Sequence, residues 1–326
     1  MYLIINGNNS PDFNLALEEH ALTEMDIEAI ILWRNSASVI IGANQNTAEE
    51  IDAEYVASRD IPVIRRQSGG GAVFHDPGNV NFTIIRDMRR GDFNNYALFT
   101  SPIIAFLETL GVRARLQGRN DLVIDGAKFC GNAQAVRRGR IMHHGCILYS
   151  ADFTELSRSL RPSGAKIESH SVKSVRNRVT NIADHMEKPM PVEEFFHRLA
   201  LYFMNNTDDI RPYELTAGDI AATERLVRDK YSKWEWNFGA SPAYNAKREA
   251  RYEFGTVEVR LFVERGIIGD IRIYGDFFGT SDKSGLENIL KGARHDRSHI
   301  ERILSGVDIG EYIKGMTSDE LLGMIC

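Results

Sequence analysis

The sequence predicts an α+β protein of two domains, and three observations lead to this class. The chain has 326 residues, which is long for one domain. Helical and extended patterns are mixed within the first sixty residues. Near residues 241–247 an aromatic-rich segment gives way to apolar residues that alternate with polar ones. We therefore expect a larger domain at residues 1–244 and a smaller α+β domain at 245–326.

Composition narrows the class of protein. The chain carries 39 Lys and Arg against 45 Asp and Glu, and this negative balance argues against a general nucleic-acid binder. No apolar run is long enough for a membrane span, and the N-terminus lacks the pattern of a signal peptide. Cys130, Cys146 and Cys326 are far apart and form no CxxC pair, which is typical of a reducing compartment. We expect a cytoplasmic protein without a membrane partner.

The first elements follow from caps and periodicity. Ser10 and Pro11 begin a predicted helix in which Phe13, Leu17 and Ala21 recur every four residues. Short Ile-rich runs at 29–33, 39–41 and 61–64 predict buried strands. A second helix is expected at 100–110, because Pro102 stands early in it and Gly111 follows its end.

Hairpins dominate the next part of the chain. Asp125-Gly126 favours a type I′ turn between strands at 122–124 and 128–130. A second strand pair is expected at 132–136 and 141–149, followed by an amphipathic helix at 191–205. In the smaller domain, alternation predicts strands at 257–263 and 267–274, with short helices from about residue 285.

The strongest chemical signal is the segment 65–76, which reads RRQSGGGAVFHD. Three consecutive glycines lose much backbone entropy on folding, so such a loop suits positive φ or the close approach of a ligand. Its amides can face an anion, and Arg65 and Arg66 supply charge beside it. Gly-Gly-Gly alone equally fits a hairpin turn, but the adjacent arginines favour an anion site. The pattern matches neither a Walker A loop nor GxGxxG.

Other candidates carry competing interpretations. Lys128, between small and apolar residues, suits a carboxylate or phosphate, although most single lysines are surface residues. Among His75, His143 and His144, we expect at most one to line a site, because neighbouring strand residues face opposite ways. No ligand spacing indicates a metal site. Cys130 and Cys146 are nucleophile candidates, with buried inert thiols as the alternative. These residues indicate an enzyme that activates a carboxylate or a nucleotide.

These segments together resemble the lipoate–protein ligase A family. The similarity runs in ordered blocks from Phe13 to about Tyr244, and the rest matches the family's C-terminal domain in position and size. The motifs that carry it are 65–76, 78–79, 81–83, 118–122, Lys128 with the small residues after it, 143–145, 174–181 and 234–239. The resemblance implies the fold of biotin and lipoyl protein ligases, a mixed β-sheet with packed helices and a small C-terminal accessory domain.

The resemblance also implies an activity. Lipoic acid and ATP, with Mg²⁺, give lipoyl-AMP, and the lipoyl group passes to a lysine of an apo lipoyl domain. The implied acceptors are the 2-oxoacid dehydrogenase complexes and the glycine cleavage H protein. Lys128 is the implied catalytic residue. The residues implied to bind ATP and lipoyl-AMP are Arg66, Gly69, Gly70, Gly71, Ala72, Val73, Phe74, Asn79, Asp121 and Lys128; those implied for lipoate are Lys128, Val73 and His75. No metal ligand is assigned with certainty.

Three further expectations concern motion, acceptors and rivals. Residues 163–174 and the C-terminal domain are the expected mobile pieces, and Arg137, Arg138 and Arg140 are candidates for acceptor recognition. The closest rival is an ATP-independent octanoyl or lipoyl transferase of the same superfamily, which would use a cysteine. A non-catalytic lipoyl-binding module and a biotin ligase are weaker alternatives, since Lys128 and the glycine loop are intact and the loop has the SGGGAVFHD form.

Overall fold

The computed structural model describes residues 1–45, 47–160, 178–238, 246–264, 266–295 and 297–326. The chain forms two compact units. The first contains residues 1–41, 48–65 and 72–237, and the second contains 42–47, 66–71 and 238–326. The expected domain boundary at 244/245 and the expected mobile segment 163–174 lie outside the described residues, so both stay predictions.

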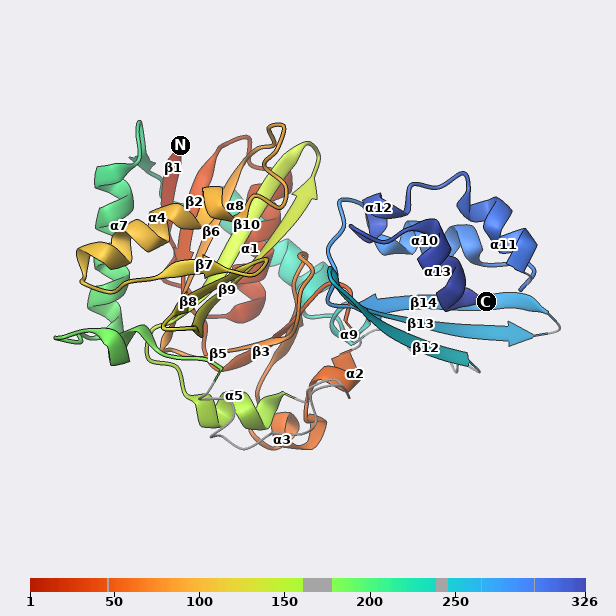
Figure 1. Cartoon of the computed structure of the whole chain (residues 1–326). Coiled ribbons are helices and arrows are strands. Elements are labelled where there is room, and N and C mark those ends of the chain that lie inside the picture. Colours follow the sequence, from red (N-terminus) through yellow and green to blue (C-terminus); the bar gives the residue numbers. More distant parts are fainter. Residues whose placement is uncertain (46, 161–177, 239–245, 265, 296) are drawn as a thin grey trace. The chain divides into compact units, whose positions relative to one another are not determined.

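A mixed sheet of eight strands forms the centre of the first unit (Figure 1), which confirms the mixed sheet that the family resemblance implies. Its strand order is β11-β1-β2-β6-β10-β9-β8-β7. β1 pairs in parallel with β2 and β11, and every other pairing in this order is antiparallel. The strands are β1 (Tyr2–Ile5), β2 (Ala29–Trp33), β6 (Asn79–Asp87), β7 (Arg115–Gln117), β8 (Asp121–Ile124), β9 (Ala127–Arg137), β10 (Arg140–Leu148) and β11 (Arg211–Pro212).

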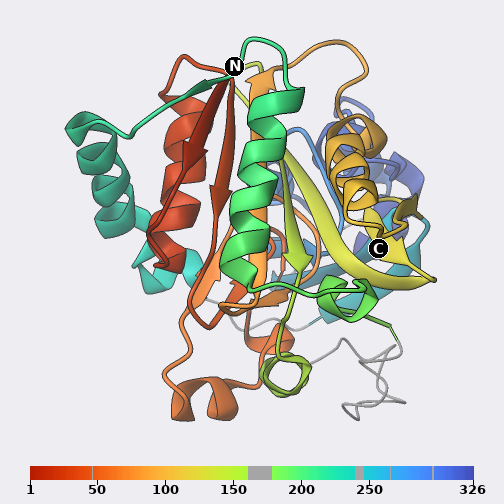
Figure 2. The same ribbon diagram turned by 90° about the vertical axis from the view of Figure 1, so that its left-hand side faces the viewer.

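Helices cover both faces of this sheet (Figure 2). One face buries Trp33, Ile85 and Met142 against Leu17 of α1 (Pro11–Thr23). α8 (Ala217–Leu226) and the following π-helical turn η3 (Val227–Tyr231) pack on α1. The opposite face buries Phe82 with residues of α4 (Tyr96–Thr109) and α7 (Val192–Asn206). The two faces of the sheet are therefore covered by separate apolar layers. A buried polar residue in the layer on the α1 side is an exception to its surroundings.

The predicted helices form, with shifts at their starts. α1 begins at Pro11, but the Ser10 hydroxyl engages Asp12 instead of capping the helix backbone. α4 begins at Tyr96, four residues before the predicted start, because the Asn95 side chain accepts a hydrogen bond from the Leu98 amide. Pro102 thus lies inside α4, where it cannot bond the Leu98 carbonyl. The Ser101 hydroxyl donates to that carbonyl instead, at 3.2 Å.

The two predicted hairpins are present. Asp125 and Gly126 have φ values of 51° and 86°, which is the positive-φ pair that a type I′ turn requires. Arg138 and Gly139 link β9 to β10 with φ values of 50° and 74°.

A second sheet of the first unit has the order β4-β3-β5. β4 starts at 63 instead of the predicted 61, because the Ile61 amide still donates to the Val56 carbonyl of the helix α3 (Ala53–Ser58). This sheet comprises β3 (Ser38–Ile41), β4 (Val63–Arg65) and β5 (Val73–His75). The short helical elements of the chain before residue 238 are α2 (Thr47–Glu50), α3 (Ala53–Ser58), α5 (Phe153–Ser159), η2 (Ile182–His185) and α9 (Trp234–Asn237).

The C-terminal part of the second unit has its own apolar core, with Val257, Ile271 and Leu286 among its members. Antiparallel strands β13 (Gly255–Glu264) and β14 (Ile267–Gly275) match the predicted pair. The sequence did not predict β12 (Ala246–Tyr252), whose mostly exposed residues carry no clear alternation. The helices are α10 (Lys283–Leu290), α11 (Arg297–Leu304), α12 (Ile309–Tyr312) and α13 (Ser318–Ile325). Of the helices that the structure describes, none is long and apolar enough to cross a membrane.

Candidate active site

The glycine loop belongs to the second unit. Its Gly70 has φ of 92°, and a Cβ at Gly69 would stand 2.4 Å from the Phe277 carbonyl oxygen. A Cβ at Gly42 would stand 1.9 Å from the Gly70 carbonyl oxygen. The Gly275 amide also donates to the Asn44 carbonyl at 2.8 Å. The loops after β3 and β4 therefore pack closely on each other and on the end of β14, and glycine is needed for that approach.

The two arginines of the loop segment have different surroundings. Arg66 is buried, and its guanidinium donates to the Gly69 and Gly71 carbonyls at 2.7 and 2.9 Å. Arg65 donates through Nε to the Trp236 carbonyl at 2.9 Å, and the Trp236 indole donates back to the Arg65 carbonyl at 2.8 Å. The Trp-rich motif of α9 thus fixes Arg65 at the end of β4. Arg65 therefore has a structural partner within the first unit.

β5 and its neighbours hold the next predicted residues. Phe74 and His75 are buried and Val73 is half-buried, while Ala72 precedes the strand. The Asn35 amide donates to His75 Nδ1 at 3.0 Å, so this nitrogen acts as the acceptor. The Asn35 carbonyl oxygen accepts in turn from Asn14 of α1 at 2.8 Å. A polar chain from α1 therefore fixes the orientation of the His75 ring.

Asn79 lies fully buried at the start of β6. Its Nδ2 donates to Cys146 Sγ at 3.0 Å, and its Oδ1 accepts from the Asp76 amide at 3.1 Å. Burial raises the pKa of Asp76, against hydrogen bonds from the Asp152 and Gly78 amides that lower it. The turn before β6 is thus fixed by side chains, and it aligns Asn79 with β10.

Lys128 lies on β9 with a carboxylate beside it. Its Nζ is 2.8 Å from Asp121 Oδ1, and both side chains are more than a third exposed. The Lys128 amide donates to the Arg178 carbonyl at 2.9 Å, and the Thr180 amide donates to the Lys128 carbonyl at 2.8 Å. A Cβ on Gly131 would lie 2.9 Å from Nζ, so the ammonium extends over that glycine. The motif segment that contains Arg178 and Thr180 therefore fixes the backbone of a lysine whose charged end stays accessible.

A buried polar network on the α1 face is absent from the sequence predictions. Glu18 of α1 accepts from the Thr83 hydroxyl at 2.5 Å, and His144 Nδ1 lies 2.8 Å from the same carboxylate oxygen. The Trp33 indole donates to Thr83 at 2.9 Å. The one sequence signal is a glutamate beside the apolar stripe of the first helix. The network brings together residues from α1, β2, β6 and β10.

The candidate histidines and the candidate cysteine Cys130 have different surroundings in the structure. His143 faces the α4 side, where it stacks on Phe99 at 4.8 Å, and burial holds its pKa well below the usual range. His144 faces the α1 side, so the two histidines do point opposite ways. Cys130 is buried, and burial raises its pKa well above the ordinary thiol value. A thiol with a raised pKa is a poor nucleophile, which weakens Cys130 as the nucleophile of a cysteine-based transferase.

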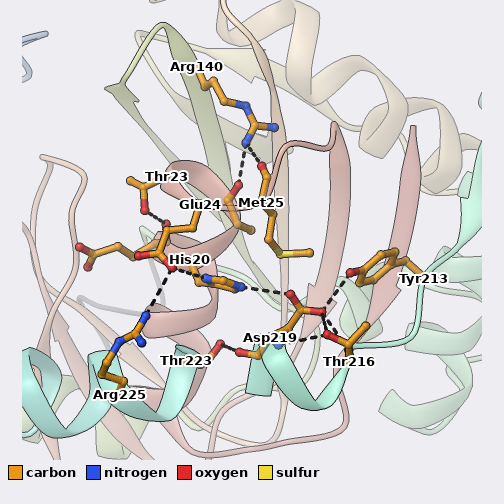
Figure 3. A network of polar contacts seen from close by, with 12 residues as sticks. His20, Thr23, Glu24, Met25, Arg140, Tyr213, Thr216, Asp219, Thr223 and Arg225 are labelled. Atoms are coloured by element: carbon orange, nitrogen blue, oxygen red, sulfur yellow. Dashed lines mark hydrogen bonds and ion pairs between the residues drawn. The ribbon is translucent and has the colours of Figure 1, made fainter. Parts of the chain in front are cut away.

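Two of the three candidate acceptor arginines, Arg138 and Arg140, contact carbonyls at the end of α1, and Figure 3 shows Arg140 there. Arg140 donates to the Ala21 and Met25 carbonyls at 2.8 and 2.5 Å and to the Ile27 carbonyl. Arg138 donates to the Thr23 carbonyl at 2.8 Å. Cations satisfy free carbonyls at a helix C-terminus, so these contacts are structural. Acceptor recognition by Arg137, Arg138 and Arg140 stays a prediction.

The structure thus groups the predicted residues in part. It brings Lys128 to Asp121, and Asn79 to Cys146, all in the first unit. Arg66, Gly69, Gly70 and Gly71 lie in the second unit. In the described part of the chain, no group of three or more His, Cys, Asp or Glu side chains gathers in a way that would hold a metal ion.

Comparisons with known proteins identify the family of the chain. The profile of the lipoyl protein ligase A/B catalytic domain matches residues 10–204, and that of the bacterial lipoate protein ligase C-terminus matches 241–325. The chain is 41% identical over 330 residues to lipoate-protein ligase LplJ of Bacillus subtilis (strain 168), with each chain fully covered.

Two solved structures show the same fold. A lipoate-protein ligase A bound with ATP has a TM-score of 0.64 and 28% identity, covering 73% of this chain and 98% of its own. A bi-partite lipoate protein ligase with its E2 lipoyl domain, from Thermoplasma acidophilum, has a TM-score of 0.65 and 29% identity, covering 75% and 98%. The chain therefore belongs to the lipoate–protein ligase family, and its activity is that of a lipoate–protein ligase.

Proposed function

We propose that the chain performs this ligation in two steps at Lys128. In the first step, a carboxylate oxygen of lipoic acid attacks the α-phosphorus of ATP, forming lipoyl-AMP and releasing pyrophosphate. In the second, the amine of an acceptor lysine attacks the lipoyl carbonyl carbon, AMP leaves, and the amine loses a proton. The observation that carries the proposal is the accessible Lys128 ammonium, held over Gly131 by Asp121.

Lys128 suits both steps as an electrostatic catalyst. Negative charge develops on the phosphate oxygens in the first step and on the carbonyl oxygen in the second. A fixed ammonium stabilises such charge most when water is excluded. Asp121 holds Nζ at 2.8 Å before substrate arrives, so the ammonium is oriented in advance. Schiff-base chemistry is not required.

Arg66 and the glycine loop are the proposed adenylate-binding elements. The Arg66 guanidinium donates to carbonyls of its own loop, and a phosphate oxygen can take the place of those acceptors. Amides of Gly69 to Gly71 and of Ala72 to Phe74 are the proposed further contacts, and Asn79 is a further proposed ATP-binding residue. Val73 and His75 are proposed to border the lipoate chain.

The Mg²⁺ ion fits as a companion of ATP. Such ions are commonly held by one or two carboxylates together with substrate phosphates, and Asp121 offers one partly exposed carboxylate. When bound, the ion would neutralise charge on the phosphates.

Acceptors and compartment complete the proposal. We infer that the acceptors are apo lipoyl domains of 2-oxoacid dehydrogenase complexes and the glycine cleavage H protein. The lipoyl domain named with the Thermoplasma acidophilum ligase supports this class of partner. None of Cys130, Cys146 and Cys326 forms a disulfide bond, which suits a reducing compartment such as the cytoplasm.

The test mixes the purified protein with lipoic acid, Mg-ATP and an apo lipoyl domain, and weighs the acceptor by mass spectrometry. We expect one lipoyl mass gain that needs ATP and is lost in Lys128→Ala. The exposed Lys188 provides the matched control, and Lys188→Ala should retain the wild-type rate. Lipoylation or octanoylation from a carrier protein without ATP would contradict the proposal, and so would an active Lys128→Ala.

A further inference from the structure

One buried amide of the first unit has neither of its polar atoms satisfied. Asn81 on β6 is 1% exposed, and within the described residues its Nδ2 and Oδ1 make no hydrogen bond. Buried side-chain amides nearly always have a partner, and an orphaned one destabilises the protein. Such a residue indicates that a bound molecule supplies the missing hydrogen-bond partner.

The sheet register places Asn81 on the same face as the Lys128 ammonium. Cys146 of β10 lies between Gly131 of β9 and Asn81 of β6, directly opposite both, and Trp33 of β2 lies opposite Asn81 on its other side. Directly opposite residues project from the same face of a sheet. Lys128 Nζ extends over Gly131, and strands lie ~4.8 Å apart. Asn81 is therefore two strands away from that lysine, roughly 10 Å across the sheet.

The polar neighbours of Asn81 are engaged with other groups. Two positions along β6, the Thr83 hydroxyl donates to Glu18 and accepts from Trp33. In the other direction, Asn79 donates to Cys146. The network around Glu18 and the pair at Asn79 thus stand on either side of Asn81 without using its amide.

We propose that Asn81 is a specificity-determining residue that recognises the sulfur-containing ring of the lipoyl group, an inference that rests on the proposed function. The ring sulfurs lie about six bonds from the carboxyl carbon, roughly 7 Å at the advance of an extended chain. A carboxylate in contact with Lys128 adds ~3 Å. The ring then reaches Asn81, whose Nδ2 donates to a sulfur.

This contact favours lipoate because a substrate without sulfur leaves the hydrogen bond of the Asn81 amide unmade. Sulfur is a weak acceptor, but a hydrocarbon in the same position accepts nothing. An apolar acyl group would cover the amide and leave it both dry and unpaired. Sites built to hydrogen-bond a substrate reject analogues that lack the matching atom more strongly than apolar pockets reject a change in size.

The test compares lipoic acid with 5-cyclopentylpentanoic acid, in which two methylenes replace the two sulfurs of a ring of the same size. Pyrophosphate release is measured with Mg-ATP and an apo lipoyl domain. For the wild-type protein we expect kcat/KM to be about tenfold higher for lipoate. In Asn81→Leu, which keeps the volume and removes the amide, the ratio should fall to within twofold of one.

Further variants keep the test decisive. Asn81→Ala removes the same amide without adding bulk, so it serves if the leucine variant does not fold by circular dichroism. Thr100→Val replaces a buried hydroxyl on α4, which packs on the opposite face, and should keep the wild-type ratio. A wild-type ratio in a folded Asn81 variant, as expected if a bound water satisfies the amide, would overturn the inference. Absence of ATP-dependent acylation in the wild-type protein would instead overturn the proposed function itself.

Discussion

At the scale of the residue, Gly131 leaves room for the Lys128 ammonium, which we propose to be catalytic. A Cβ there would lie 2.9 Å from Lys128 Nζ, which is inside ordinary contact distance. Nζ is the free end of a flexible chain, so it moves aside at small energetic expense. We therefore expect the chain to fold with alanine at 131, but with Lys128 Nζ displaced from its position beside Asp121.

We predict that Gly131→Ala lowers kcat/KM for lipoylation by roughly 100-fold, the effect of displacing a catalytic group by about 1 Å. The melting temperature should change by less than about 4 °C, as for a change below ~1 kcal/mol. Gly7→Ala is the matched control, because a Cβ at Gly7 meets nothing within 4 Å. Wild-type activity in Gly131→Ala would show that Nζ does not act from the position seen here.

The sequence predicts some residues of the candidate site but not all of their contacts. The motifs single out Lys128 and Asp121, which the structure brings together through adjacent strands. His144 is a candidate in the sequence, but its contact with Glu18 and that of Thr83 escape prediction, because they join α1, β6 and β10 across 65 and 126 positions of sequence. Such a network depends on which strands become neighbours. Local pattern does not contain that information.

At the scale of the element, α8 is tied to α1 through one carboxylate (Figure 3). Asp219 closes a capping box with Thr216, accepts from the Tyr213 hydroxyl at 3.0 Å, and lies 3.2 Å from His20 Nε2. Burial alone would raise the pKa of Asp219, but the hydrogen bonds from Thr216, His20 and Tyr213 outweigh it and lower the pKa to about 2. The charged form is thus the one that the fold stabilises.

We predict that Asp219 stabilises the folded chain at neutral pH and that this contribution is lost at low pH. The pKa is lower in the folded chain than the ordinary 3.8, so the contribution is full above about pH 4 and disappears as pH falls toward 2. It amounts to about 2 kcal/mol. Urea unfolding between pH 6 and 3 should give a lower free energy of unfolding for Asp219→Asn than for the wild type. The difference between the two proteins should become smaller as the pH falls. The exposed Asp229→Asn should show no such narrowing; a constant gap for Asp219→Asn would contradict the assignment.

Elements with a strong local signal are the ones the sequence predicts well. Asp125-Gly126 determines a turn by itself, because both residues readily adopt positive φ. β12 and the start of α4 were missed for the opposite reason. β12 pairs through its backbone with β13 while its side chains stay mostly exposed, and α4 begins at the cap made by Asn95, which the apolar pattern of residues 100–110 does not reveal.

At the scale of the whole molecule, the chain buries separate apolar cores. One core of the first unit includes Leu107 and Phe82, whereas the C-terminal core includes Leu286 and Ile271. Neither core shares a residue with the other. Units with their own cores are expected to unfold with their own transitions.

We therefore predict two calorimetric transitions that single substitutions shift one at a time. Leu286→Ala removes a fully buried side chain of the C-terminal core and should destabilise that transition by about 2–5 kcal/mol. Leu107→Ala is the matched change in the first unit, with the same residue type and the same complete burial, and should shift only the other transition. If either variant shifts both transitions equally, the two cores unfold as one cooperative body. In that case loss of the C-terminal core would also be expected to unfold the sheet that carries Lys128.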